Sequence, residues 1–161
     1  MSRQVGILSK QGHEREFPVD VKNQTSLNLP VRWHEGSAGL DLISSKNYIL
    51  QPHSFKTIPT EVQVAIPPDH FGLIAPRSNL GSKGIIPMAG IIDANFSGTI
   101  SVVMFNHSEQ EFEISTKNGF AQLIIAKLCN STPILLSPKR FANHHSHSQR
   151  GSLGFGSTDV N

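Results

Sequence analysis

The chain has 161 residues, of which 37% are hydrophobic and 16% are charged, a balance that supports one hydrophobic core and excludes a disordered, self-repelling chain. The formal net charge is only +2, and no block of lysine and arginine occurs, so we expect no polymeric nucleic-acid partner. A single cysteine, Cys129, excludes an internal disulfide.

Neither an export signal nor a membrane span is expected. Residues 1–18 are polar and charged throughout and lack the apolar core of a secretory signal. The most apolar stretch, residues 121–136, is interrupted by Lys127, Asn130 and Pro133, whereas a membrane-spanning helix needs about 20 apolar residues. We therefore expect an intracellular protein, in the cytoplasm or the nucleus, without a membrane partner.

Short strands dominate the predicted secondary structure. Residues 61–66 alternate almost perfectly between polar and apolar side chains, and residues 99–105 are rich in β-branched side chains, which suit a half-buried pleated surface. With 13 glycines and 10 prolines and no long amphipathic window, the pattern predicts an all-β sandwich or barrel with little helix. Further strands are expected over residues 38–43, 48–50, 71–75, 111–114 and 122–128.

The periodic pattern ends at Pro138. Residues 139–148 are polar, and we interpret them as a mobile tether. The histidines of this stretch can bind a metal, but solvated side chains are the commoner use of such a cluster. The tether leads to the glycine-rich residues 150–158. We expect one β domain over residues 1–138 and a flexible arm over residues 139–161.

Two short segments point to phosphate chemistry. Arg77 and Ser78 follow a predicted strand, where a guanidinium fork and a hydroxyl can grip phosphoryl oxygens, although an arginine in a surface ion pair is the alternative. Asp93 follows an apolar pair and precedes a turn, where a β-hairpin would hold its carboxylate rigidly enough to orient a water. The alternative for Asp93 is a turn-capping aspartate.

The glycine-rich end and two isolated polar residues add further candidates. Glycines of residues 150–158 let backbone N–H groups approach a phosphate, and Phe155 can stack on a base, unless the segment is only a linker with an incidental aromatic. Asp41 and Gln122 each interrupt an apolar run, so each needs a polar partner. A ligand, a metal-bound water, a neighbouring chain or the main chain can supply that partner.

Taken in order, these segments resemble the five signature motifs of the trimeric dUTPase family, over about residues 37–158. Five short patterns in the right order carry far more information than any one of them. The matching segments are residues 38–42, 76–78, 90–98, 119–123 and 150–158.

The resemblance implies a homotrimer of jelly-roll-like β subunits, with each active site assembled from three chains. The arm of one subunit would close over a neighbour's site. The implied reaction is Mg²⁺-dependent hydrolysis of dUTP to dUMP and pyrophosphate, which lowers dUTP and supplies dUMP for thymidylate synthesis.

The resemblance also implies residue roles. Asp93 would hold and activate the attacking water, and Gln122 would fix that water or the α-phosphate. Asp41 would support the hydration shell of Mg²⁺, which the substrate phosphates would mainly hold. Main-chain groups of the hairpin between Ile85 and Ile92 would read the uracil. The implied substrate-binding residues are Arg77, Ser78, Asn79, Met88, Gly90, Ile92, Asp93, Phe96, Gln122, Arg150, Phe155, Gly156, Ser157 and Thr158.

Several positions depart from the family pattern. Phe96 stands where a tyrosine that packs on the deoxyribose is usual, Asn79 replaces a common glycine, and Gly119 occupies a place that is often basic. Two other functions remain as alternatives. One is a dCTP deaminase-like enzyme, in which the water attacks the base. The other is a non-catalytic trimer that binds nucleotide or a regulatory partner.

Overall fold

A computed structural model describes residues 19–21, 30–116, 118–129 and 131–145 of the chain. The chain divides into two units, residues 1–129 and residues 130–161. The described residues of the first unit form antiparallel strands and one short helix, α1 (Ser78–Gly81), which confirms the expected all-β fold. Its strands are β1 (Val19–Val21), β2 (Leu40–Ile43), β3 (Tyr48–Leu50), β4 (Ser54–Pro59), β5 (Val62–Val64), β6 (His70–Ala75), β7 (Ile85–Met88), β8 (Ile91–Ile92), β9 (Ser101–Asn106), β10 (Phe112–Ile114) and β11 (Gly119–Lys127).

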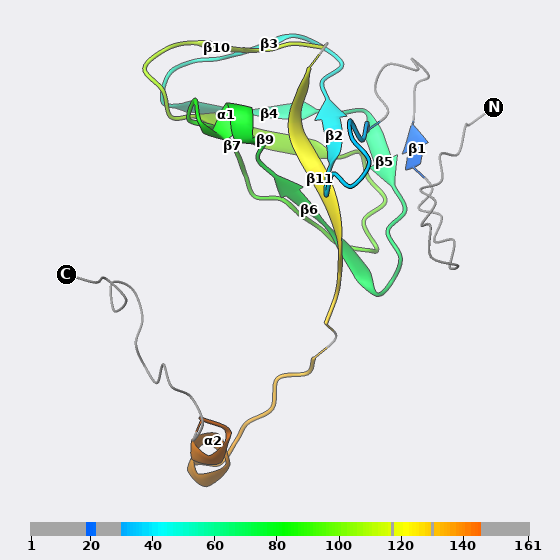
Figure 1. Cartoon of the computed structure of the whole chain (residues 1–161), viewed down its shortest axis with the longest axis vertical. Coiled ribbons are helices and arrows are strands. Elements are labelled where there is room, and N and C mark those ends of the chain that lie inside the picture. Colours follow the sequence, from blue (N-terminus) through cyan, green and yellow to red (C-terminus); the bar gives the residue numbers. More distant parts are fainter. Residues whose placement is uncertain (1–18, 22–29, 117, 130, 146–161) are drawn as a thin grey trace. The chain divides into compact units, whose positions relative to one another are not determined.

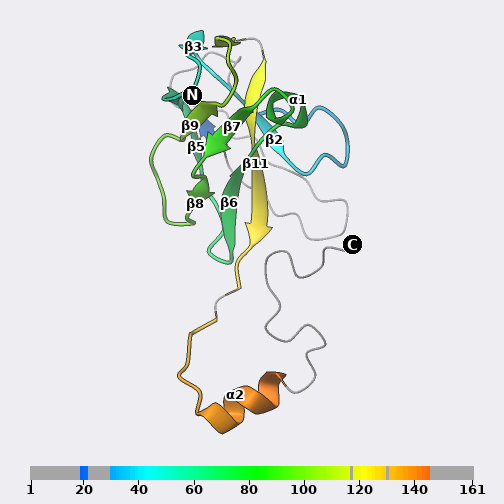
Figure 2. The same cartoon turned by 90° about the vertical axis from the view of Figure 1, so that its left-hand side faces the viewer.

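The described strands form two main sheets. One has the order β2-β11-β6-β8 and the other the order β4-β9-β7, while β1 pairs with β5 and β10 pairs with β3. The long strand β11 runs between β2 and β6, as both views show (Figure 1, Figure 2). Its register with β2 shifts between Gly119 and Ala121, so β11 carries a bulge near its start.

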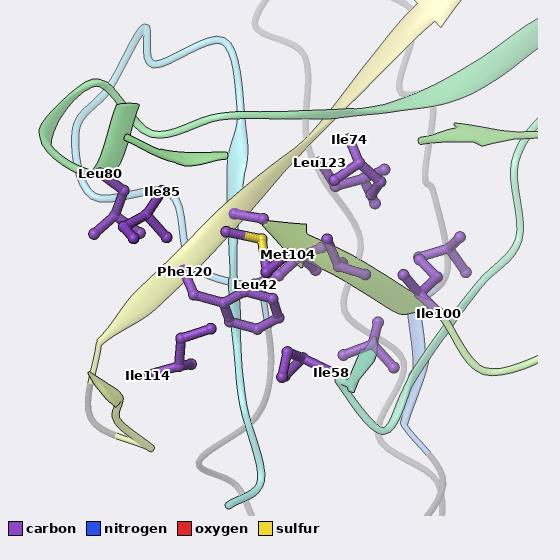
Figure 3. Packing of buried hydrophobic residues seen from close by; sticks show 14 of the residues in the cluster. Leu42, Ile58, Ile74, Leu80, Ile85, Ile100, Met104, Ile114, Phe120 and Leu123 are labelled. Atoms are coloured by element: carbon purple, nitrogen blue, oxygen red, sulfur yellow. The ribbon is translucent and has the colours of Figure 1, made fainter. Parts of the chain in front are cut away.

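Both main sheets contribute to one hydrophobic core (Figure 3). Leu42 and Phe120 enter it from the four-stranded sheet, and Ile58 and Met104 enter it from the three-stranded sheet. Buried and more exposed residues alternate along β9, as the period of two requires. Each large side chain buried in this way stabilises the fold by about 1.5–3 kcal/mol. The shared core has the layered construction that the jelly-roll-like prediction required.

Parts of this unit differ from the sequence prediction. Strand β4 was not expected, because Lys56 and Pro59 break its apolar pattern; it lies at the edge of its sheet, where proline is tolerated. The predicted hairpin between Ile85 and Ile92 is wrong, since β7 pairs with β9 whereas β8 pairs with β6 in the other sheet. The segment between β7 and β8 therefore crosses from one sheet to the other.

Close backbone packing fixes this crossing segment. Ala89 has a positive φ of 57°, a backbone conformation that residues other than glycine seldom adopt. The Gly90 carbonyl accepts a hydrogen bond from the Ile74 N–H at 2.7 Å. A Cβ atom at Gly90 would lie 2.8 Å from Cβ and 2.9 Å from the carbonyl oxygen of Ile74, so only glycine fits here.

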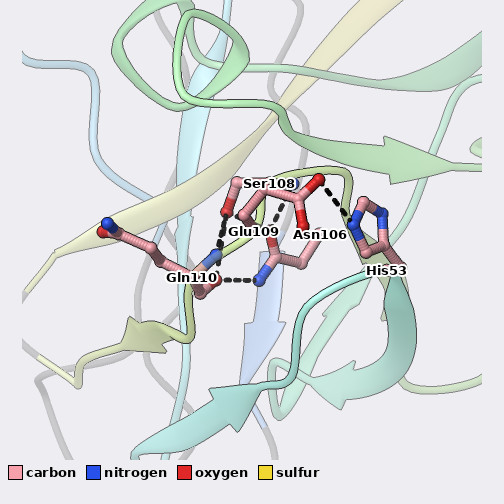
Figure 4. A network of polar contacts seen from close by, with 5 residues as sticks. All are labelled: His53, Asn106, Ser108, Glu109 and Gln110. Carbon is pink, nitrogen blue, oxygen red and sulfur yellow. Dashed lines mark hydrogen bonds and ion pairs between the residues drawn. The ribbon is translucent and has the colours of Figure 1, made fainter.

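A buried asparagine fixes the turn after β9 (Figure 4). The Asn106 side chain is fully buried and donates to the carbonyl groups of Leu50 and Gln110, at 3.1 and 2.7 Å. Its Oδ1 accepts from the Ser108 N–H and hydroxyl, at 2.9 and 2.7 Å. On the outside of the same turn, His53 Nε2 lies 3.0 Å from Glu109 Oε1. The network satisfies the buried amide, as a low-dielectric interior demands.

The second unit contains helix α2 (Pro138–His145), where the sequence analysis expects a tether without regular structure. Its start carries the signals of a helix N-terminus. The Ser137 hydroxyl accepts from the Arg140 N–H at 3.4 Å, and Pro138 occupies the first helical position. Residues 146–158, with the predicted glycine-rich arm, lie outside the described residues. Among the described residues, no helix is long and apolar enough to cross a membrane.

Candidate functional site

Strand register places the two isolated polar residues side by side. Asp41 on β2 pairs with Gln122 on β11, and Gln122 pairs on its other side with Ala75, the last residue of β6. Two residues beyond Ala75 comes Arg77, just before α1. The sheet therefore gathers an acid, an amide and a guanidinium that are distant in the sequence.

Arg77 is anchored at both of its terminal nitrogens. Nη2 lies 2.9 Å from Asp41 Oδ2, and Nη1 donates to the Gly119 carbonyl in a short hydrogen bond. The Arg77 side chain is 25% exposed and that of Asp41 only 9%, so the pair is much less solvated than a surface ion pair. The ion pair considered as an alternative for Arg77 is thus present, but it lies inside the candidate site.

Asp41 retains unused capacity to accept hydrogen bonds. Its Oδ2 is buried and, among the described residues, has no hydrogen-bond partner. Arg77 Nη2 is within 2.9 Å, and we take this contact as charge compensation without an aligned N–H···O bond. An ionised carboxylate has room for several donors, and no described residue supplies one to this oxygen with hydrogen-bond geometry.

Two glycines make room for these side chains. A Cβ atom at Gly39 would lie 2.3 Å from Gln122 Oε1, and one at Gly119 would lie 2.9 Å from Cβ of Asp41. Gln122 Nε2 donates to the Pro76 carbonyl at 2.8 Å, which holds its amide in place. Glycine at position 119 therefore leaves room for the Asp41 side chain, which lies against Arg77.

A cavity of about 440 Å³ opens at this cluster. It brings together five of the predicted site residues, all on β2, on β11 or at the start of α1. It also includes an aromatic and a histidine that the sequence analysis missed, Trp33 and His34. The only available signal was that Trp33 is the chain's single tryptophan. The lining residues are Trp33, His34, Ser37, Gly39, Asp41, Arg77, Ser78, Asn79 and Gln122.

The remaining predicted residues do not line this cavity. Met88, Gly90 and Ile92 lie on or between β7 and β8. Asp93 is exposed in the turn that follows, where its carbonyl accepts from the Phe96 N–H at 3.0 Å. The Phe96 side chain, 42% exposed, closes over Gly98. Arg150, Phe155, Gly156, Ser157 and Thr158 lie outside the described residues.

The chain is similar to proteins of one known family. The dUTPase family model matches residues 25–159. The deoxyuridine 5'-triphosphate nucleotidohydrolase of Mus musculus is 36% identical over 142 residues, covering 88% of this chain and 84% of the mouse protein. That of Candida albicans is 36% identical over 134 residues, covering 83% and 82%.

Solved structures show the same fold. A Staphylococcus bacteriophage 80alpha dUTPase variant with dUpNHpp superposes with a TM-score of 0.75 at 26% identity, covering 91% of this chain and 99% of the phage chain. The described strands form the all-β fold of these solved dUTPases. The chain belongs to the dUTPase family.

Proposed function

We propose that this chain hydrolyses dUTP to dUMP and pyrophosphate. The observation that carries the proposal is the strand register that sets Asp41 beside Gln122 and brings Arg77 onto Asp41. These positions belong to three separate motifs of the predicted site, and one cavity holds them all. The product dUMP would serve thymidylate synthesis, and the reaction would keep dUTP low. An intracellular location, in the cytoplasm or the nucleus, stays part of this proposal, although a relative from Dictyostelium discoideum is named mitochondrial.

The cavity suits the phosphate groups of the substrate. Arg77 presents a fixed positive charge, because its two anchoring contacts hold the guanidinium plane. Ser78 and Asn79 add a hydroxyl and an amide at the same wall. Gln122, held by Pro76, would orient the α-phosphate or the attacking water. Positioned donors of this kind stabilise the negative charge that develops during phosphoryl hydrolysis.

Asp93 would act as the general base, on a different surface of the same chain. Its exposure leaves the carboxylate open to water, and the turn closed by Phe96 fixes its backbone. Met88, Gly90, Ile92 and Phe96 around it would bind the base and the sugar. A water held by Asp93 would lose its proton as it attacks the α-phosphorus.

The residues of the cavity fit Mg²⁺ that is held mainly by the substrate. Among the described residues, no group of three or more His, Cys, Asp or Glu side chains is placed to hold a metal. Asp41 brings one carboxylate with an unsatisfied buried oxygen. Mg²⁺ commonly keeps several waters and binds one or two carboxylates plus substrate phosphates. Bound there, the ion would neutralise charge on the phosphate oxygens.

A homotrimer would unite the two halves of the site, since Asp93 and the cavity lie on different parts of one subunit. The outer face of the three-stranded sheet supports such an assembly. Solvent-facing positions of a sheet are normally polar. On this face, however, the strand register pairs Phe105 with Phe55 and Ile86, and it pairs Val103 with Met88. Phe55 is 66% and Met88 45% exposed. An uncharged apolar surface that reaches Met88 suits contact with a second copy of the chain.

This assembly is tested with matched lysine substitutions. Phe55→Lys puts a charge on the apolar face and should shift the protein from trimer to monomer in size-exclusion chromatography with light scattering. Ile49→Lys, at a 40% exposed position on β3 opposite Glu113, should leave the trimer intact. A monomeric wild-type protein, or a trimeric Phe55→Lys protein, would remove this face from the proposal.

The catalytic role is tested by neutralising one carboxylate. Asp93→Asn should lower kcat for pyrophosphate release from dUTP by a factor of about 10² to 10⁴, while dUpNHpp binding stays near the wild-type level. Glu109→Gln removes another exposed carboxylate from a different turn and should keep full activity. Full turnover in Asp93→Asn would exclude Asp93 as the base.

The same assay separates the alternatives. Incubation with dCTP, scored for ammonia, tests the deaminase-like function, which the comparisons do not support. Absence of turnover with retained dUpNHpp binding would indicate the non-catalytic trimer. Deletion of residues 150–161, which contain Arg150 and Phe155, should slow dUTP turnover sharply while the trimer persists. An unchanged rate after that deletion would contradict a role for the arm.

A further inference from the structure

Trp33, the only tryptophan of the chain, lines the cavity. None of the predicted motif residues that line the same cavity is aromatic. Trp33 as a whole residue is 59% exposed. Tryptophan seldom leaves so much of its ring in water without an apolar or hydrogen-bonding partner for it. Its exposure at the mouth of a polar cavity calls for a ligand as that partner.

The backbone around Trp33 is tied to the site. Val31 forms an isolated bridge with Asp41, with N–H···O distances of 3.1 and 2.8 Å in the two directions. A turn follows, closed by the Ser37 N–H on the His34 carbonyl at 3.1 Å, with Gly36 at a φ of 88°. Trp33 is therefore held between two fixed points, one of which is the backbone of Asp41.

The charge balance of the cavity leaves a need for more donors. Arg77 Nη1 already donates to the Gly119 carbonyl, and Nη2 lies against the Asp41 carboxylate, which offsets the charge of the guanidinium. A triphosphate presents many acceptor oxygens and several negative charges. The indole Nε1–H is a pure donor, and the electropositive edge of the ring suits an anion, whereas its face does not.

We infer that Trp33 is a substrate-binding residue, whose indole N–H donates to a phosphate oxygen of the nucleotide in this cavity. The inference rests on the proposed function and adds a residue to its phosphate site. The indole contact would stabilise the bound substrate and the transition state equally, because it lies away from the water that Asp93 would hold.

Fluorescence of the single tryptophan reports on this contact directly. The emission of the full-length trimer should change on titration with dUpNHpp and with inorganic pyrophosphate. Deoxyuridine, which has no phosphate, should leave the emission unchanged. Calorimetry with dUpNHpp measures binding independently of the fluorescence.

Steady-state kinetics then isolates the N–H group. Trp33→Phe keeps an aromatic ring without the donor, and it should raise KM for dUTP roughly tenfold with kcat nearly unchanged, since a hydrogen bond to a charged group is lost in both states. Val31→Ala alters the same segment at a residue outside the cavity lining, and it should keep the wild-type KM.

The outcomes separate this inference from the proposed function. If calorimetry shows dUpNHpp binding while the emission stays constant, or if Trp33→Phe keeps the wild-type KM, Trp33 does not contact the phosphates. A response to deoxyuridine alone would also overturn the inference. If dUpNHpp does not bind and dUTP is not hydrolysed, the proposed function fails, and the role of Trp33 fails with it.

Discussion

Replacing Gly119 by alanine tests the packing on which the site depends. The new Cβ atom would lie 2.9 Å from both Cβ and Oδ2 of Asp41 and 3.0 Å from its Cγ, whereas carbon atoms in contact prefer about 3.5–4.0 Å. The close contact includes Cβ of Asp41, so rotation of the Asp41 side chain cannot relieve it. Either strand β2 or strand β11 must move.

The expected loss follows from two contributions. Overpacking of a tight site costs about 1–3 kcal/mol. Displacing Asp41 also weakens its ion pair with Arg77, and loss of a fully buried pair costs about 3–5 kcal/mol. Because the Arg77 side chain is 25% exposed, only part of that cost applies. We expect Gly119→Ala to lower the free energy of unfolding by about 2–4 kcal/mol.

The assay is thermal unfolding at a fixed protein concentration, together with kcat/KM for dUTP. For a chain of this size, 1 kcal/mol corresponds to about 2–4 °C in Tm, so Tm should fall by about 5–15 °C. Gly81→Ala is the matched control, because a Cβ atom in α1 meets no heavy atom within 4 Å and alanine favours a helix by about 1 kcal/mol. Equal Tm values for the two variants, or an unchanged Gly119→Ala protein, would refute the steric argument.

Three further substitutions test the packing and hydrogen bonds of the fold. Gly90→Ala should lower Tm and dUTP turnover together, because its Cβ would press on the Ile74 backbone; normal values for both would show that the crossing segment adapts. Asn106→Ala removes four hydrogen bonds and should cost about 2–4 kcal/mol in urea unfolding, a loss that a wild-type midpoint would contradict. Thr60→Val keeps the shape but deletes both hydrogen bonds of the buried hydroxyl, to the Ile100 carbonyl at 2.9 Å and from the Val62 N–H at 3.2 Å, so urea unfolding should reveal a loss of about 1–3 kcal/mol.

Local sequence patterns predicted the strands well where a strand has one buried face. The alternation over residues 61–66 identified β5, since burial of every second residue leaves a direct trace in the sequence, and the β-branched side chains of residues 99–105 identified β9. Strand β4 escaped because an edge position tolerates Pro59. Helix α2 was missed although Ser137 and Pro138 form a recognisable helix start.

Long-range pairing was beyond the reach of local patterns. Apolar residues before Asp93 indicated strands, but nothing in them specified that β7 and β8 join different sheets. The motifs identified Arg77 and Asp41 as candidates, whereas their ion pair depends on β11 lying between β2 and β6. Trp33 belongs to no periodic segment, so only the folded chain shows it at the cavity.

The bulge at the start of β11 has a consequence for how this strand can change in evolution. In a regular strand Phe120 and Gln122 would point to the same side, because side chains alternate. Phe120 is the extra residue between Gly119 and Ala121 in the register with β2. It therefore enters the core together with Leu123, three positions further on, while Gln122 lines the cavity. A one-residue deletion there would restore the regular alternation. The strand would then lose either the Phe120 side chain from the core or the Gln122 amide from the cavity. Insertions and deletions in this short stretch should therefore be selected against more strongly than most substitutions.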